Sequence, residues 1–412
     1  MPLKPFQFTK AFIRERCDYC GRCFHECPPL HLPLEQAQKE IRTLIDGGDS
    51  EVLRRCTGCM ACNSICPYDA NPHTLIMNRW SERNRKEGLF GPAGLVLPYQ
   101  EPNLYTVALR RLPEDESVLV RQWEQNWREP PACDTMIFAG CNMMLQPFLM
   151  DSALYADIPI FGSLQLCCGE PFYRMGCWDA AKAAALNVKR EFDRMRLKKI
   201  IVPCLACHHL FTHVYPKVLD VPLDVEVTPI EDWLYGRIMN GEIKVAPLNV
   251  AAVVQDNCWP KASGDALFDK VRALLALLGV TAVEPENTRE RALCCGMCAG
   301  AARFSLLDTL KAANKLLGAL ERTQADLVVD YCGGCNWLLG IANSMFLSRY
   351  KKPRYHILEL VQMATGETPK RRTDQRARQV IRSMAAPLTR RYLRGGRFRI
   401  DSVAGIRVDG EK

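Results

Sequence analysis

The chain has 412 residues, and its 48% hydrophobic and 24% charged residues are typical of a globular protein rather than a disordered or collagen-like one. At roughly 150 residues per domain, the length predicts two or three domains. No apolar run reaches the roughly 18 residues of a membrane span, and the N-terminus lacks the apolar core of a secretion signal. We therefore expect a cytoplasmic protein with no transmembrane segment. This expectation includes a protein that is bound peripherally to the cytoplasmic face of a membrane.

Cysteine is unusually frequent for such a protein. The chain contains 21 cysteines, an odd number, so a fully paired disulfide framework is not expected. Thiols at this density in a reducing compartment indicate metal binding. Their positions along the chain define the expected domains.

The first 70 residues contain two copies of one cysteine motif. CDYCGRCFHECP and CTGCMACNSICP both have the spacing C-x2-C-x2-C-x3-C-P. In this pattern three close thiolates hold one iron–sulfur cluster, and the fourth ligates the other cluster. The expected metal ligands are therefore Cys17, Cys20, Cys23 and Cys66 for one cluster, and Cys56, Cys59, Cys62 and Cys27 for the other. Structural zinc is the alternative, but it usually separates two C-x2-C pairs by a longer loop.

This part of the chain resembles a bacterial two-cluster ferredoxin. The resemblance implies a small, mainly α-helical domain over residues 1–80 with two cubane [4Fe-4S] clusters. Residues 81–132 contain no cysteine and are rich in proline, glycine and charge, so we interpret them as a connector.

The middle of the chain contains an internal duplication. CCG at 167–169 recurs at 294–296, and CLAC at 204–207 recurs as CGGC at 332–335. Each CxxC follows a β-branched run, KKIIVP or ADLVVDY, and helical patterns lie between the runs. Alternating strands and helices predict an α/β fold with a parallel sheet in each of two similar lobes, residues 133–245 and 246–365.

Adjacent cysteines can meet one metal centre only if the chain bends, and Gly169 and Gly296 allow such a bend. The layout resembles the CCG (cysteine-rich) domain of the heterodisulfide reductase catalytic subunit and its relatives. The resemblance implies up to two non-cubane [4Fe-4S] clusters, one in each lobe, with a disulfide reduced at one of them. The implied cofactor-binding residues of the first lobe are Cys141, Cys167, Cys168, Cys204 and Cys207. The candidate catalytic set of the second lobe is Cys258, Cys294, Cys295, Cys332 and Cys335.

Several assignments stay open at this point. Cys133 would give the first lobe a spacing closer to that of the second, but Cys141 ends a strand as Cys258 does, and we favour it. Cys133, Cys177 and Cys298 remain unassigned and are expected to be small buried residues, with a place near the cluster as the less favoured alternative for Cys298. The alternative for the CCG copies is a vicinal disulfide or buried free thiols. We expect His208 and His209 at an exposed helix start, and Trp259 in the core.

The motifs fit two redox functions. In the first, ferredoxin-type clusters deliver electrons to a CCG-lobe cluster that reduces a disulfide. In the second, the chain is a non-catalytic electron-transfer subunit that links a flavoprotein dehydrogenase, of the glycolate, lactate, glycerol-3-phosphate or acyl-CoA type, to a quinone or membrane cytochrome. A zinc scaffold is the non-redox alternative. The sequence has no GxGxxG or Walker A motif, so flavin or nucleotide chemistry is expected in a partner subunit.

The positive charge of the chain is concentrated in its last residues. The chain carries a net +8, whereas residues 370–412 alone carry +9 and the other 369 residues carry −1. Residues 366–412 are therefore interpreted as a basic tail that docks on an acidic partner or an anionic membrane, with a solvated flexible tail as the alternative. We expect no nucleic-acid binding.

Overall fold

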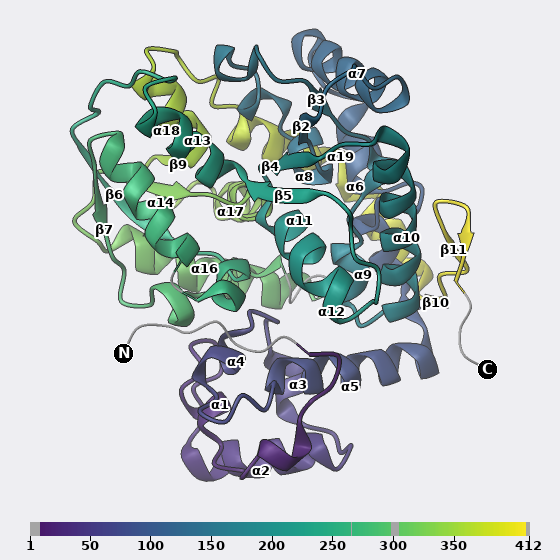
Figure 1. Cartoon of the computed structure of the whole chain (residues 1–412). Coiled ribbons are helices and arrows are strands. Elements are labelled where there is room, and N and C mark those ends of the chain that lie inside the picture. Colours follow the sequence, from purple (N-terminus) through teal and green to yellow (C-terminus); the bar gives the residue numbers. More distant parts are fainter. Residues whose placement is uncertain (1–8, 265, 298–304, 409–412) are drawn as a thin grey trace.

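The computed structural model describes residues 9–264, 266–297 and 305–408. A small helical domain lies below a larger α/β body (Figure 1), and this body contains two four-stranded sheets. The predicted fold class is confirmed. None of the helices in the described ranges combines the length and apolar character that a membrane span requires.

The N-terminal domain consists of short helices around the two cysteine motifs. Helix α2 buries Ala37, Ile41 and Leu44 at helical spacing, and the Ser50 side chain caps α3 by accepting a hydrogen bond from the Val52 N–H. These side chains pack with Trp80 from the long helix that leads out of the domain. The helices are α1 (Arg22–His25), α2 (Leu34–Ile45), α3 (Glu51–Arg55), α4 (Ala61–Ile65) and α5 (Pro72–Glu87), after a 3₁₀ turn at Arg14–Arg16.

The first lobe is built on a parallel sheet with strand order β3-β2-β4-β5. Its two central strands are almost wholly buried, as expected for a parallel sheet covered on both faces. The strands are β2 (Thr135–Phe138), β3 (Ile160–Phe161), β4 (Lys199–Val202) and β5 (Glu226–Pro229). The helices are α8 (Cys141–Met144), α9 (Glu170–Arg174), α10 (Trp178–Met195), α11 (Leu205–His209), α12 (Tyr215–Lys217) and α13 (Ile230–Met239), with a π-helical turn between α11 and α12 at Leu210–Val214.

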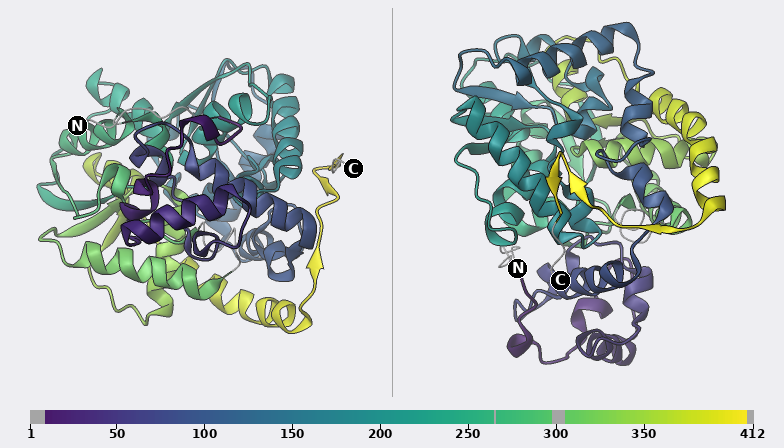
Figure 2. Two further views of the ribbon diagram at one scale, coloured as in Figure 1. Left: turned by 90° about the horizontal axis from the view of Figure 1, so that it is seen from below. Right: turned by 90° about the vertical axis from the view of Figure 1, so that its right-hand side faces the viewer.

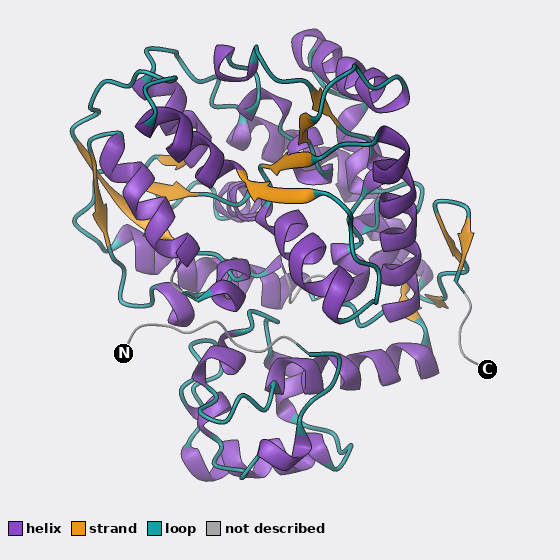
Figure 3. Ribbon diagram, in the orientation of Figure 1, coloured by secondary structure: helices purple, strands orange, loops and turns teal. Residues whose placement is uncertain are grey.

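The second lobe repeats this topology with strand order β7-β6-β8-β9, again all parallel. The sheets of both lobes lie among helices (Figure 3), and the duplication expected from the cysteine motifs is therefore seen in the fold. The strands are β6 (Val250–Gln255), β7 (Val280–Val283), β8 (Leu327–Asp330) and β9 (Arg354–His356). The helices are α14 (Ala266–Leu277), α16 (Leu306–Glu321), α17 (Gly333–Met345) and α18 (Ile357–Ala364).

The two lobes share apolar packing. One hydrophobic core contains Ile200 of β4 together with Val254 of β6 and Leu274 of α14. Helices α13 and α14 contact each other across the boundary, as do α8 and α17. The lobes therefore form one body.

The segment expected to be a connector is mostly folded onto the first lobe. After α5 it forms β1 (Leu89–Phe90), a 3₁₀ turn at Gly91–Val96, α6 (Leu104–Leu109) and α7 (Glu114–Arg128). Helix α7 packs beside the edge strand β3, and the Gly162 N–H donates a hydrogen bond to the Trp123 carbonyl. The polar composition of this segment gave no indication that one side of α7 is buried, with Val120 and Trp123 in the core.

Within the described residues, the basic tail packs against the chain's own body rather than forming the solvated flexible tail that was the alternative. Residues Thr373–Arg394 form α19, which packs on α6 and α17. Strand β10 (Arg397–Phe398) then pairs with β1, and the hairpin of β11 (Ser402–Val403) and β12 (Ile406–Arg407) lies against α10 (Figure 2). The reason is partly electrostatic, because Arg376 and Glu116 form a buried ion pair at 2.7 Å.

Candidate iron–sulfur sites

The first motif and the last cysteine of the second motif lie together. Burial raises the pKa of the Cys17 thiol, and the nearby Cys66 thiolate raises it further. Burial also raises the pKa of Cys23 well above its usual value, with added contributions from Cys66, Cys17 and Cys20. Gly21 starts α1 with φ of 75°, and a Cβ atom there would lie 2.7 Å from the Gln38 nitrogen. The chain can therefore wrap its three close thiols toward one point. We name Cys17, Cys20, Cys23 and Cys66 the distal set.

The remaining four thiols of this domain form a second group. Burial raises the pKa of Cys27, and the neighbouring Cys59 and Cys56 raise it further. Burial likewise raises the pKa of Cys62, and the neighbouring thiols Cys56, Cys27, Cys23 and Cys59 raise it further. Cys27 of the first motif therefore has two thiols of the second motif among its neighbours. We name Cys27, Cys56, Cys59 and Cys62 the proximal set.

These donor sets suit iron–sulfur clusters. Each set consists of four thiols, and burial suppresses the ionisation of Cys23, Cys27 and Cys62 unless positive charge is bound. The Gly58 N–H also donates a hydrogen bond of 3.2 Å to the Cys56 Sγ atom, as backbone amides do at cluster ligands. Within the described ranges, no three Cys, His, Asp or Glu side chains converge as closely as a single metal ion requires.

In both lobes the cysteines follow the carboxyl ends of the two central strands. Cys141 and Cys204 follow β2 and β4, and Cys258 and Cys332 follow β6 and β8. In each sheet the strand order reverses between these two strands, and open α/β sheets bind their ligands at such a point. The topology therefore places the cysteines of each lobe where a ligand site is expected.

The second-lobe thiols gather at the start of α17. Cys332 caps that helix and Cys335 lies in its first turn. A hydrogen bond with Cys295 raises the pKa of Cys335, and a further one with Cys332 adds to it. Cys294 packs in the same apolar cluster. We name Cys258, Cys294, Cys295, Cys332 and Cys335 the second-lobe set.

The bend between Cys294 and Cys295 depends on a glycine. Gly296 has φ of 98°, a conformation that side chains disfavour, and a Cβ atom there would lie 2.5 Å from the Thr309 carbonyl oxygen. Its N–H donates a 3.3 Å hydrogen bond to the Cys294 Sγ atom. The glycine therefore lets the adjacent thiols share one site and directs an amide at one of them.

The first-lobe thiols form a similar group. A hydrogen bond with Cys141 raises the pKa of Cys167, and a second one with Cys168 adds to it. A hydrogen bond from Cys167 lowers the pKa of Cys168 to about 5, helped by one from Cys207. A hydrogen bond from Cys207 also lowers the pKa of Cys204. We name Cys141, Cys167, Cys168, Cys204 and Cys207 the first-lobe set.

Cys133 lies apart from that set. Burial raises the pKa of Cys133, and its other neighbours are the Thr135 N–H and the Asp134 carboxylate rather than a thiol. Cys177 precedes α10, where burial raises its pKa to about 12. Cys298 lies outside the described residues.

One expectation about the weaker signals was wrong and one is confirmed. His209 is buried rather than exposed, and its ring stacks on His213 at 4.9 Å between centroids. The residues that follow it in the π-helical turn, Leu210, Phe211 and Val214, also pack in the core. Trp259 is buried, as expected, with its ring centroid 4.7 Å from that of His209.

The proximal set lies against the second lobe. The Cys294 Sγ atom is 3.8 Å from the Thr57 carbonyl oxygen, and Cys59 belongs to the same apolar cluster as Cys294. Two polar contacts support this interface: Arg291 pairs with Glu26 at 2.7 Å, and Lys315 donates to the Pro28 carbonyl at 2.8 Å. The second-lobe set is therefore next to the proximal set.

The two lobe sets are linked through α8. The Asn142 amide donates to the Cys204 Sγ atom at 3.8 Å, and a Cβ atom on Gly334 would lie 3.3 Å from the same amide nitrogen. The Gln146 amide donates to the Gly333 carbonyl at 2.9 Å, close to Cys332. Helix α8 and the residue Gln146 that follows it therefore connect the first-lobe set to the start of α17, where the second-lobe set lies.

Sequence reasoning missed Arg174 at the junction of three segments. Its guanidinium donates to the Gly58 carbonyl and to the Cys258 Sγ atom, both at 3.4 Å, and lies over the Trp259 ring at 4.0 Å. It also pairs with Glu170, four residues before it on α9. The E-x3-R spacing directly after the first CCG could have indicated the ion pair with Glu170. The contacts with Gly58 and Cys258 could not be predicted, because these residues are far away in the sequence.

Comparisons with known proteins identify both parts of the chain. Residues 10–67 match the family described as 4Fe-4S dicluster domain, and residues 150–212 and 252–340 match the cysteine-rich domain. The matched ranges contain both ferredoxin motifs and nine of the ten lobe cysteines, because Cys141 precedes the first range. The cluster type and the duplicated lobes are therefore found independently of the spacing argument.

Curated relatives share this arrangement at low identity. The chain is 23% identical to a subunit of fumarate reductase (CoM/CoB) from Methanothermobacter marburgensis, over 89% of this chain and 75% of that protein. It is 20% identical to an uncharacterized iron–sulfur protein of Methanococcus maripaludis, over 73% of this chain and 59% of that protein. It is 26% identical to a subunit of anaerobic glycerol-3-phosphate dehydrogenase from Escherichia coli strain K12, over 44% and 47%. It therefore spans only about half to three fifths of the latter two relatives. With its [4Fe-4S] clusters, the chain is an iron–sulfur electron-transfer protein of the heterodisulfide-reductase-like family.

Proposed function

We propose that this protein passes electrons from the distal and proximal sets to the second-lobe set, where a disulfide is reduced to two thiols. The clusters held by these cysteines supply electron transfer in single-electron steps. The observation that carries the proposal is the contact between Thr57 and Cys294, since it joins the proximal set to the second lobe without intervening segments.

The reaction needs two electrons and two protons for each disulfide. The sulfur–sulfur bond breaks, each sulfur gains one electron and one proton, and two thiols leave. The electrons come from an external reduced carrier, and the protons come from water. Arg174 supports this chemistry at Cys258, because a guanidinium beside a sulfur offsets the negative charge that builds up there.

A viologen-driven assay tests the proposal. The anaerobically purified protein should oxidise reduced viologen when a low-molecular-weight heterodisulfide is added. Cys295→Ser should abolish this turnover, because it removes a thiol that hydrogen-bonds with Cys294 and Cys335. Cys133→Ser is the matched control, since Cys133 is half-buried and its neighbours are not thiols. Full turnover by Cys295→Ser would contradict the assignment.

A second function is favoured by the burial of the lobe cysteines. Cys294, Cys295, Cys332 and Cys335 are 4–7% exposed, and the first-lobe set is 0–6% exposed. Sites this enclosed also suit a protein that only conducts electrons, from a flavoprotein dehydrogenase to a quinone or membrane cytochrome. The name of the glycerol-3-phosphate dehydrogenase relative supports this alternative. It predicts cluster reduction by viologen with no turnover of any disulfide.

We place the protein in the cytoplasm, at a redox complex that includes a flavoprotein or a membrane cytochrome subunit. The high cysteine content supports this location, because thiols at this density are typical of metal-binding proteins in a reducing compartment. The names of the relatives support the complex, since both the fumarate reductase and the glycerol-3-phosphate dehydrogenase proteins are called subunits.

A further inference from the structure

The exposed face of α19 is strongly basic. Residues 375–394 contain six arginines and no acidic residue. Arg376 is buried against Glu116, and Arg391 donates to the Gly91 carbonyl. The other four, Arg378, Arg382, Arg390 and Arg394, are exposed and have no ion pair with any residue that the structure describes. Their charge is therefore available to a partner.

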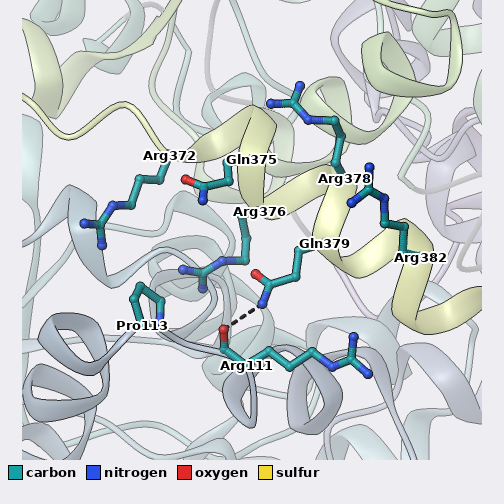
Figure 4. A pocket seen from close by; sticks show the side chains of 8 residues that line it. All are labelled: Arg111, Pro113, Arg372, Gln375, Arg376, Arg378, Gln379 and Arg382. Atoms are coloured by element: carbon teal, nitrogen blue, oxygen red, sulfur yellow. Dashed lines mark hydrogen bonds between the residues drawn. The ribbon is translucent and has the colours of Figure 1, made fainter.

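A cavity of about 560 Å³ lies beside the first turns of α19, at one end of this basic face. It is lined by Arg111, Pro113, Arg372, Gln375, Arg376, Arg378, Gln379 and Arg382. In Figure 4, Arg376 and Gln379 extend from α19 toward Arg111 and Pro113, and the Gln379 amide is hydrogen-bonded to the Arg111 carbonyl, whereas Arg378 and Arg382 extend away from that segment. The lining has no carboxylate, whereas the planar guanidinium group can bind a carboxylate through two parallel hydrogen bonds. We name Arg111, Arg378, Arg382, Arg390 and Arg394 the arginine face.

The opposite side of the same helix touches the first-lobe set. Val380 and Met384 pack in one apolar cluster with Cys141, Cys167 and Trp337. The arginine face and these cysteines are thus separated by little more than the helix itself, about 10 Å with its side chains. A redox centre held on the arginine face would be close to the first-lobe set.

We propose that the arginine face is the docking site of an acidic redox protein that exchanges single electrons with the first-lobe set. This proposal rests on the proposed function only in using the chain of cysteine sets as the electron route. One electron passes between the partner's redox centre and the first-lobe site, with no bond formed or broken in the protein.

The extent of the face favours a protein over a small anion. From Arg378 to Arg394 the helix advances sixteen residues, about 24 Å, which exceeds the reach of one small anion. A membrane suits this face less well. A helix that binds a lipid surface buries an apolar face along its length in it. In α19, Ala377 and Val380 already pack against protein, and the large apolar side chains it exposes, Tyr392 and Leu393, are confined to its last turn.

Charge reversal tests the docking site. The variant combines Arg378→Glu, Arg382→Glu and Arg390→Glu, and the control combines Arg54→Glu, Arg83→Glu and Arg190→Glu at other surface helices with the same change in net charge. The probe is a reduced acidic two-cluster ferredoxin, and stopped-flow absorbance measures the rate at which it reduces each protein. Steered association gains at least about tenfold from charge and loses it with salt. The wild-type rate should therefore fall about tenfold between low and high salt. The arginine variant should already have the slow, high-salt rate of the wild type at low salt.

Two further measurements separate the possible outcomes. Reduction by viologen should be equal in all three proteins, which shows that the clusters are intact whether or not a disulfide is turned over. Equal ferredoxin rates in the arginine variant and the control would overturn the proposal. So would unchanged ferredoxin rates combined with selective loss of binding to anionic phosphatidylglycerol vesicles, which would make the face a membrane contact.

Discussion

The Arg174 guanidinium lies 3.4 Å from the Cys258 Sγ atom and 4.0 Å from the centre of the Trp259 ring. Arg174 belongs to the first lobe, whereas the other two residues belong to the second. It also donates to the Gly58 carbonyl, in the loop of the proximal set. One buried cation therefore contacts both the second lobe and the N-terminal domain from the first lobe.

Replacing this cation should change the reduction potential of the site next to it. Hydrogen bonds to cluster sulfurs and nearby positive charge favour the reduced state. Arg174→Met should lower one midpoint potential by about 60 mV, which is a tenfold change for one electron. Arg174→Lys keeps the charge and should give a smaller shift. Redox titration followed by electron paramagnetic resonance measures both, and unchanged potentials in the methionine variant would show that Arg174 only packs there.

Gly296→Ala should damage the second-lobe site. The substitution forces a side chain into a conformation with φ of 98° and against the Thr309 carbonyl, so the bend at the CCG motif cannot be kept. Four four-iron clusters contain about 16 iron atoms, and the variant should lose about four of them. Gly241→Ala is the control, because Gly241 also has a positive φ of 75° but no atom within 4 Å of the added Cβ. Full iron content in Gly296→Ala would contradict the assigned bend.

Features that depend on residues close together in the sequence could be predicted, whereas features that depend on residues far apart could not. The spacing within the CxxC and CCG motifs is local, so the cysteine sets and the α/β repeat could be expected from the sequence. The burial of α7 and α19 could not, because their compositions are dominated by charge and the apolar positions Val120 and Val380 are few. Arg174 was missed because its partners lie more than 80 residues away in sequence.

The buried ion pair between Arg376 and Glu116 should anchor the tail. The two side chains are 2% and 0% exposed, and the separation is 2.7 Å. Glu116→Ala leaves an uncompensated buried guanidinium, so it should lower the free energy of unfolding by about 3–5 kcal/mol. Glu101→Ala breaks the exposed pair with Arg110 and should cost less than about 1 kcal/mol. Urea unfolding of both variants measures the difference, and equal losses would contradict the anchoring role.

Glu231 should make stability decrease with rising pH. Burial raises the pKa of Glu231 to about 8 from the usual 4.5. Between these values the unfolded chain has lost a proton that the folded chain retains, so unfolding becomes easier as pH rises and the effect levels off above about pH 8. From pH 6 to 8, the wild type should lose up to about 3 kcal/mol relative to Glu231→Gln. Parallel pH profiles of the two proteins would show that this carboxyl ionises normally.

The central claim, that a disulfide is reduced at a lobe site supplied by the N-terminal domain, is tested most directly by electron paramagnetic resonance. The protein is oxidised anaerobically and its spectrum is recorded before and after a candidate thiol is added. The account predicts a new paramagnetic signal that depends on the thiol and is absent in Cys295→Ser. Identical spectra with and without every thiol tested, in a protein whose clusters are otherwise reducible, would contradict it and leave electron transfer alone as the function.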